Sequence, residues 1–493
     1  MGALLHRLLR KWSTWISLTI LCVIISVAAI LASCGGTSSV RLMNRTGTVN
    51  VSITDPPACA FPNGQFVHVY VSVRSVQANI SSTAGGSDPG WVELAPQLNS
   101  EPMQIDLFAA GPNVCLLTIL GSNTALPAGT YQQIRLILVA NSGNTGSVPA
   151  SNACGNQGYN CVVMHDGTVA ELALSSEANT GIKIPAGQVE GGPITVNPGQ
   201  DVDLNIDFNA CASIIEEGNG TFRLKPVLTA GQVSTNSTGI DGQVEDSTTT
   251  KAVVGGTALV ALEEQVDGAP DTIVRETTAD SSGNFNFCPL PAGTVFDVVA
   301  VAINGAGQAY NATVITGVAG GTNLGAIPLT PETAAPAGPA TLQGFVTATT
   351  GSAAANIDVA VSALQTITLS SGMTRMITIP AEGTSVAGIS LQSASSCPAT
   401  APLHTNCAQY TLIEPASNPV MGAFSGGKVS YSAPASGGVL YSVGASAFVP
   451  MGGGTTDCQP SSKTVDVNNL GNPLAVSAGA IATPQEIDFS GCS

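Results

Sequence analysis

Short runs of alternating apolar and polar residues dominate this chain. Val49, Val51 and Ile53 alternate with polar neighbours, and Val67–Val73 has valine at every second position. This period of two is typical of β-strands with one buried face. Further strands are expected at Gln104–Phe108, Tyr131–Val139, Val202–Phe208 and Phe222–Leu228, between clusters of Gly, Pro and Asn. Helical periodicity is absent after the N-terminal segment, so the pattern predicts an all-β protein of tandem antiparallel β-sandwiches.

Composition agrees with this fold class and suggests several units. Only 10% of the residues are charged, and there are 55 Gly and 30 Pro, which disfavours long surface helices. A chain of 493 residues, at roughly 100–200 residues per domain, predicts about three domains. The net charge of −17 disfavours nucleic acid as a partner.

The N-terminus has the pattern of an export signal. His6, Arg7, Arg10 and Lys11 precede an uncharged apolar run that ends in Leu31-Ala32-Ser33-Cys34. This ending resembles a bacterial lipobox, which implies a signal peptide at residues 1–33, lipidation of Cys34, a tether at 34–45 and attachment to a membrane, for which Gly35 favours the outer membrane. The apolar run, residues 12–32, is also long enough for the alternative, an uncleaved transmembrane anchor helix.

Four blocks between residues 46 and 232 resemble a known family. They are Gly47–Pro57, Leu126–Leu136, Leu204–Phe208 and Arg223–Val227, and in this order they resemble the bacterial "domain of unknown function 4382" family. The resemblance implies an exported β-sandwich without established activity. The family usually has Asp-Ala-Pro where this chain has Asp55-Pro56-Pro57, and no disulfide pattern carries over.

Two further units follow this first one. Residues 239–330 offer about seven strands, the size of an Ig-like sandwich, and Thr278–Phe287 with Leu290–Gly293 resembles carboxypeptidase-regulatory-like or transthyretin-like domains. The resemblance implies a spacer or binding platform. A Pro/Ala linker at 331–340 leads to residues 341–493, which we interpret as a divergent repeat because both units begin with Gly-x-Val, at Gly242 and Gly344.

Cysteine usage indicates an oxidising compartment. Cys22 lies in the signal and Cys34 is the lipid acceptor, which leaves ten of the 12 cysteines, without any Cys-x-x-Cys motif. Short spacing predicts disulfides Cys154–Cys161 and Cys397–Cys407, and Cys458–Cys492 forms the last pair of the C-terminal region. The pairs Cys59–Cys115 and Cys211–Cys288 follow only by elimination, and buried free thiols are the alternative for them.

The best acidic pattern lies on one predicted strand. Asp201, Asp203, Asn205 and Asp207 share one face of it, which predicts either a solvated strand face or, as the alternative, a calcium site at Asp201, Asp203 and Asp207. Asp280 is expected to cap its turn, with a metal as the alternative.

No catalytic motif stands out. His68, His165 and His404 are far apart in the sequence and lack metal-ligand spacing. We therefore expect a non-catalytic, lipid-anchored cell-envelope protein with a structural, adhesion or binding role and without a cofactor. The alternatives are a carbohydrate- or protein-binding module of a surface polymer-handling system, whose partner is a cell-surface protein or polysaccharide, and a surface hydrolase that uses Asp or Glu.

Overall fold

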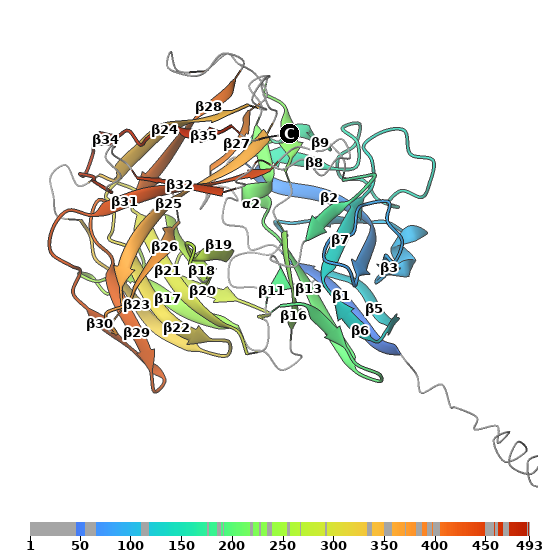
Figure 1. Cartoon of the computed structure of the whole chain (residues 1–493), viewed down its shortest axis with the longest axis horizontal. Helices are drawn as coiled ribbons and strands as arrows, with labels where there is room; N and C mark the ends of the chain where they lie inside the picture. Colours follow the sequence, from blue (N-terminus) through green and yellow to red (C-terminus); the bar gives the residue numbers. More distant parts are fainter. Residues whose placement is uncertain are drawn as a thin grey trace, which may run out of the picture. The chain divides into compact units, whose positions relative to one another are not determined.

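In the computed structural model, residues 46–493 form one compact unit that is separate from residues 1–45. The structure describes residues 46–493 apart from 55–65, 110–117, 175–176, 185–188, 191, 217–219, 226–227, 234–238, 254–256, 267, 291–292, 333–337, 350–356, 370, 381–386, 392–396, 398–404, 449–457, 459–461, 467–472, 491 and 493. The predicted signal, Cys34 and the tether lie outside these residues. Nearly all described elements are strands, as the alternating pattern predicted (Figure 1).

Two large sheets and one two-stranded sheet are formed by residues 46–233, and the large sheets enclose one core. The first sheet has the order β11-β16-β13-β1-β5, and its strands are Val189–Glu190, Leu228–Val233, Asp201–Phe208, Thr46–Thr54 and Thr118–Pro127. Val49, Val51 and Ile53 of β1 point into the core. β1 pairs antiparallel with β5 but parallel with β13, whereas the sequence predicted antiparallel pairing throughout. Alternation identifies a strand and its faces, but it carries no information about strand direction.

The second sheet of this region contains nine strands. Seven follow the order β10-β7-β2-β8-β9-β15-β14, and β3 and β4 also pair with β2. Their bounds, in that order, are Ile182–Ile184, Gln133–Leu138, Phe66–Asn79, Cys161–Met164, Val169–Ala173, Phe222–Leu224, Ile214–Glu216, Val92–Glu93 and Met103–Asp106. A small two-stranded sheet pairs β12, Ile194–Val196, with β6, Gly129–Tyr131. The 3₁₀ turn η1, Pro96–Asn99, and the short helix α2, Ala210–Ser213, are the remaining described elements of this region.

The next region begins with a three-stranded and a six-stranded sheet. The small sheet has the order β20-β17-β23, with bounds Asn284–Phe287, Ile240–Asp246 and Asn323–Leu329. The large sheet has the order β19-β18-β21-β22-β29-β30, with bounds Thr272–Thr278, Thr257–Glu264, Val295–Ile303, Thr313–Ala319, Val420–Ser425 and Lys428–Ser432. Figure 1 shows β29 and β30 near β22, and β29 pairs parallel with β22. A late hairpin of the chain thus extends a sheet that begins at residue 257.

Two more sheets are formed by the C-terminal residues. One is β28-β24-β34 with β35 also paired to β24, with bounds Asn406–Glu414, Ala340–Ala348, Ile481–Ala482 and Ile487–Phe489. The other is β26-β25-β31-β32, with β27 on β25 and β33 on β31; the bounds are Thr374–Ile379, Ile357–Thr368, Leu440–Phe448, Ser462–Asp466, Ala387–Leu391 and Leu474–Ala475. Their apolar faces share one core.

The central strands of the six-stranded sheet are buried on both faces. Val298 and Ala300 of β21 belong to the core shared with the three-stranded sheet, whereas Val299 and Val301 belong to the core of the C-terminal sheets. The sequence explains this position, because β21 is a nearly continuous apolar run instead of an alternating one.

Candidate functional site

The acidic strand β13 is matched by a polar row on β1. Thr48 donates a hydrogen bond to Asp201, Asn50 Nδ2 donates to Asp203 Oδ1 at 2.7 Å, and Ser52 Oγ donates to Asn205 Oδ1 at 3.0 Å. The parallel register places these residues opposite each other. The row therefore consists of cross-strand pairs, which need no metal.

Calcium at Asp201, Asp203 and Asp207 stays a prediction. No group of three metal-ligating His, Cys, Asp or Glu side chains occurs among the described residues. The polar face is also not solvated along its whole length, because Asn205 and Asp207 are buried while Asp201 is exposed. Alternation indicates which residues share a face, but it does not show what packs on that face.

The histidines are dispersed. His68 Nδ1 lies 2.7 Å from Asp106 Oδ2, and its ring stacks on Tyr70 with 5.6 Å between ring centroids. His165 lies in the turn between β8 and β9, and His404 lies outside the described residues. Asp280 caps its turn as expected, since its Oδ1 accepts hydrogen bonds from the backbone N–H groups of Ser282 and Asn284, both at 2.8 Å.

Three disulfides are present among the described residues. They are Cys154–Cys161, Cys397–Cys407 and Cys458–Cys492, the same pairs that the sequence analysis predicted. Cys288 is disulfide-bonded as well. Cys59, Cys115 and the side chain of Cys211 lie outside the described part of the chain, so their pairing stays a prediction.

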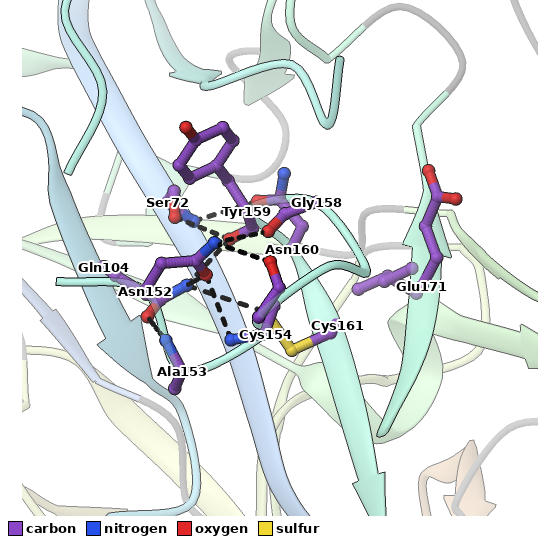
Figure 2. The surroundings of a disulfide bond; sticks show 12 residues. Ser72, Gln104, Asn152, Ala153, Cys154, Gly158, Tyr159, Asn160, Cys161 and Glu171 are labelled. Carbon is purple, nitrogen blue, oxygen red and sulfur yellow. Dashed lines mark hydrogen bonds between the residues drawn. A yellow bond between two sulfur atoms is a disulfide. The ribbon is translucent and has the colours of Figure 1, made fainter. Parts of the chain in front are cut away.

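The Cys154–Cys161 disulfide anchors the loop of residues 139–160, which connects β7 to β8 and is called here the 139–160 loop. Figure 2 shows Asn152 and Asn160 in the surroundings of this disulfide. The Asn160 side chain is fully buried: its Nδ2 donates to the Val139 carbonyl and to Asn141 Oδ1, both at 2.8 Å, and its Oδ1 accepts from Ser72 N at 2.9 Å. Asn160 thus links the base of the loop to the central strand β2.

Two amide side chains fix the far end of the loop. Asn152 Nδ2 donates to the carbonyls of Gly155 and Gly158, and its Oδ1 accepts from Cys154 N at 3.0 Å (Figure 2). Gln104 of β4 accepts from Ala153 N at 2.7 Å and donates to the Tyr159 carbonyl at 3.0 Å. A loop whose backbone groups bond to fixed side chains has lost most of its conformational freedom in advance, which lowers the entropic cost of binding.

The tip of this loop faces solvent. Ser142, Gly143, Asn156 and Gln157 are exposed, and the loop carries no charged side chain. This site was not predicted from the sequence. The cluster of Asn and Gly between two cysteines was a usable signal, because Asn side chains commonly form hydrogen bonds with nearby backbone groups.

A second feature that the sequence did not indicate is a buried charge cluster. Arg375 of β26 forms ion pairs with Asp271, at 3.0 Å, and with Asp297 of β21. The backbone N–H of Asp271 donates to the Met376 carbonyl at 2.8 Å. Glu263 is fully buried beside them, and burial together with repulsion from Asp271 holds the pKa of its carboxyl well above the ordinary value.

Glu414 is the other strongly shifted carboxyl. It is 1% exposed and lines a cavity of about 20 Å³ whose other walls are mostly apolar, among them Leu259 and Val301. Burial raises the pKa of Glu414 well above the ordinary value. Neither Glu263 nor Glu414 is therefore accessible to a polymeric substrate.

One family model matches the first region of the chain. Residues 46–226 match the family model described as domain of unknown function (DUF4382). This match agrees with the four sequence blocks, and it covers the strands that hold the 139–160 loop. No curated protein matches the chain. The carboxypeptidase-regulatory-like character of residues 239–330 stays a prediction.

Solved structures give distant likenesses. The Bacillus anthracis TIE protein shares 9% identity with a TM-score of 0.16, and the match covers 90% of this chain and 51% of that one, so this chain spans about half its length. Shaft pilin SpaA from Lactobacillus rhamnosus GG shares 11% identity with a TM-score of 0.16, covering 58% of this chain and 98% of the pilin. A streptococcal ancillary pilin shares 9% identity with a TM-score of 0.15, covering 88% and 99%. TM-scores this low carry no argument about function.

Among the described residues, no helix is long and apolar enough to cross a membrane. The N-terminal apolar run, residues 12–32, lies outside the described residues.

Proposed function

We propose that this chain is a lipid-anchored protein of the bacterial cell envelope, attached through Cys34, directed to the outer membrane by Gly35, and with a non-catalytic binding or adhesion role. The observation that carries the binding role is the 139–160 loop, which is exposed at its tip and fixed by a disulfide and by the side chains of Asn152, Asn160 and Gln104. Recognition commonly lies on loops that a rigid scaffold positions.

The charge of the molecule narrows the class of partner. With Lys+Arg 15 against Asp+Glu 32, the protein repels anionic surfaces and favours neutral or cationic ones. The loop adds hydrogen-bonding groups without charge of its own, which suits a neutral polar partner such as a surface protein or polysaccharide.

Site-specific photo-crosslinking in the native host tests this proposal. A photoreactive amino acid replaces Gln157 at the loop tip, and in a second strain it replaces the exposed Thr249, which lies between β17 and β18. We expect a discrete adduct from position 157 and none from position 249. Adding Asn160→Ala should reduce the adduct several-fold, because an unsatisfied buried hydrogen-bonding group costs about 1–3 kcal/mol and frees the loop.

Asn156→Ala is the matched control, since Asn156 lies in the same loop but is exposed. This variant should leave the adduct unchanged. The proposal fails if position 157 gives no discrete adduct, or if the purified protein hydrolyses a glycan, ester or peptide and loses that activity on substitution of one Asp or Glu.

A further inference from the structure

The outer face of the three-stranded sheet β20-β17-β23 forms a polar hollow, called here the amide hollow. It has a volume of about 460 Å³, and its polar lining consists of Asp241, Gln243, Asn284, Asn286 and Asn323. The strand register places Asp241 between Asn286 and Asn323, and Gln243 opposite Asn284. The alternate residues Ile240, Val244, Phe285 and Phe287 point to the core. Two cross-strand rows of polar side chains, four amides and one carboxylate, therefore share one open face.

Hydrogen bonds orient several of these side chains. Asn323 donates to the Asp241 carboxylate, and its Oδ1 accepts from Gly325 N at 2.8 Å. Gln243 Nε2 donates to the Ser282 carbonyl at 2.8 Å, which leaves its Oε1 directed away from that bond. Such bonds fix the polar groups before a ligand arrives, so less side-chain freedom is lost on binding.

The backbone is accessible at the same place. Gly325 has a φ of +65°, a left-handed conformation that suits glycine, and an added Cβ there would meet nothing within 4 Å. The register shift between Asp241 and Gln243 lies opposite this glycine. A bulge without a side chain lets a ligand approach the peptide groups closely.

The chemistry of the lining selects the ligand class. The hollow contains no Lys, Arg or His, so it offers no partner for an anion. Its single carboxylate, Asp241, already accepts a hydrogen bond from Asn323. One carboxylate is far fewer than the six to eight oxygen ligands that calcium prefers. Amide side chains both donate and accept hydrogen bonds. A ligand with many hydroxyl groups can therefore replace the water molecules on such a surface and form the same hydrogen bonds that they formed.

The spacing of the polar side chains in the amide hollow also suits such a ligand. Neighbouring strands lie about 4.8 Å apart, and alternate residues along one strand lie about 7 Å apart. The polar groups therefore recur on the scale of one sugar ring. The volume lies within the range of small-molecule sites, roughly 300–1,000 Å³. The Tyr431 hydroxyl donates to the carbonyl of Ala326, a lining residue, at 3.1 Å.

We infer that the amide hollow binds an uncharged glycan, with Gln243, Asn284 and Asp241 bonding to its hydroxyl groups. This inference rests on the proposed function in one respect: it names a ligand for a protein that we propose to be a non-catalytic binding protein. It involves residues 241–326 and is independent of the 139–160 loop.

A glycan array tests the inference with the full chain in a detergent that contains no sugar. The array carries neutral chito-, cello-, malto- and manno-oligosaccharides together with sulfated and uronate-containing glycans. We expect binding to at least one neutral series and none to the anionic glycans. The double variant Gln243→Ala/Asn284→Ala should weaken that binding at least about tenfold, because two ligand hydrogen bonds are lost.

Gln343→Ala is the matched control, because Gln343 is a partly exposed amide on strand β24, outside the hollow. It should bind as the unchanged protein does. The inference is overturned if no neutral glycan binds, if only anionic glycans bind, or if the double variant binds as well as the control. In each case an adduct from position 157 would still support the proposed function, so the two failures are distinguishable.

Discussion

Arg375 is the cation that neutralises a buried group of acids. Its guanidinium contacts Asp271 and Asp297, and Gln265 accepts a further hydrogen bond from Nη1 at 2.9 Å. Glu263 lies beside them with a raised pKa. Burying this many charges stabilises a fold little compared with an apolar core, but removing one partner leaves an uncompensated charge.

We therefore predict that Arg375→Met lowers the free energy of unfolding by about 3–5 kcal/mol. Urea denaturation followed by circular dichroism measures the change. Lys428→Met is the control, because Lys428 is exposed, and its effect should stay within about 0.5 kcal/mol. A loss below about 1 kcal/mol for Arg375→Met would show that the cluster behaves as a solvent-exposed ion pair.

Glu414 predicts a pH dependence with a definite sign. Its folded-state pKa is raised, so the folded protein retains the proton more strongly than the unfolded chain does. The stabilisation is complete below the unfolded pKa of about 4.3 and declines as the pH rises from there towards the folded pKa, by about 1.4 kcal/mol per pH unit. Glu414→Gln removes the titration.

The unfolding free energy of wild type minus that of Glu414→Gln should consequently fall between pH 4 and pH 8. Urea titrations at several pH values measure this difference. Glu101→Gln serves as the comparison, since Glu101 is exposed. A difference that stays constant or rises with pH would contradict the assignment.

At the scale of elements, β18 and β21 are unusual because both of their faces are covered. Leu259 and Leu262 of β18 belong to different cores, one on each side of the six-stranded sheet. In a sandwich of two sheets only one of these faces would be buried. An alternating apolar pattern thus indicates a strand with one buried face, and a continuous apolar pattern indicates a strand with two buried faces.

Leu259→Ala and Leu262→Ala should each lower the free energy of unfolding by about 2–5 kcal/mol, because each deletes a buried side chain. Val295→Ala is the control, with Val295 53% exposed at the start of β21. Chemical denaturation of the three variants measures the effects. If one of the two leucines proved neutral, the corresponding face of the sheet would have to be uncovered in solution.

The sequence was sufficient to predict strands but not their partners. Period two at Val49–Ile53 located β1 and its buried face, yet the parallel pairing with β13 depends on residues 153 positions away. The short cysteine spacings predicted the disulfides Cys154–Cys161 and Cys397–Cys407, for the same reason that local turns are predictable. Cys458–Cys492 was predicted as the last pair of the C-terminal region. Arg375 and the amide hollow could not be predicted, because their partners come from distant segments that only the completed fold brings together.

For the whole molecule, we predict a mature protein that begins at a lipid-modified Cys34. One diacylglyceryl group supplies two acyl chains, which is enough for stable anchoring. Intact mass spectrometry of the purified protein should show loss of residues 1–33 and the added lipid. Cys34→Ala should retain the unprocessed N-terminus, and an unmodified Met1 in the wild type would contradict the prediction.

The pairing of β22 with β29 has a consequence for the order in which the chain folds. Residues 46–233 contain all the described strands of their own sheets, so this part can fold as soon as it emerges from a ribosome or a secretion channel. β22 instead waits for the hairpin that ends at Ser432. During this delay its edge and the apolar side chains of Val299 and Val314 lack their cover, and an open strand edge is a template for pairing with other chains. Nascent chains that stop between residues 330 and 420 should therefore aggregate, whereas chains that stop near residue 233 should stay monomeric.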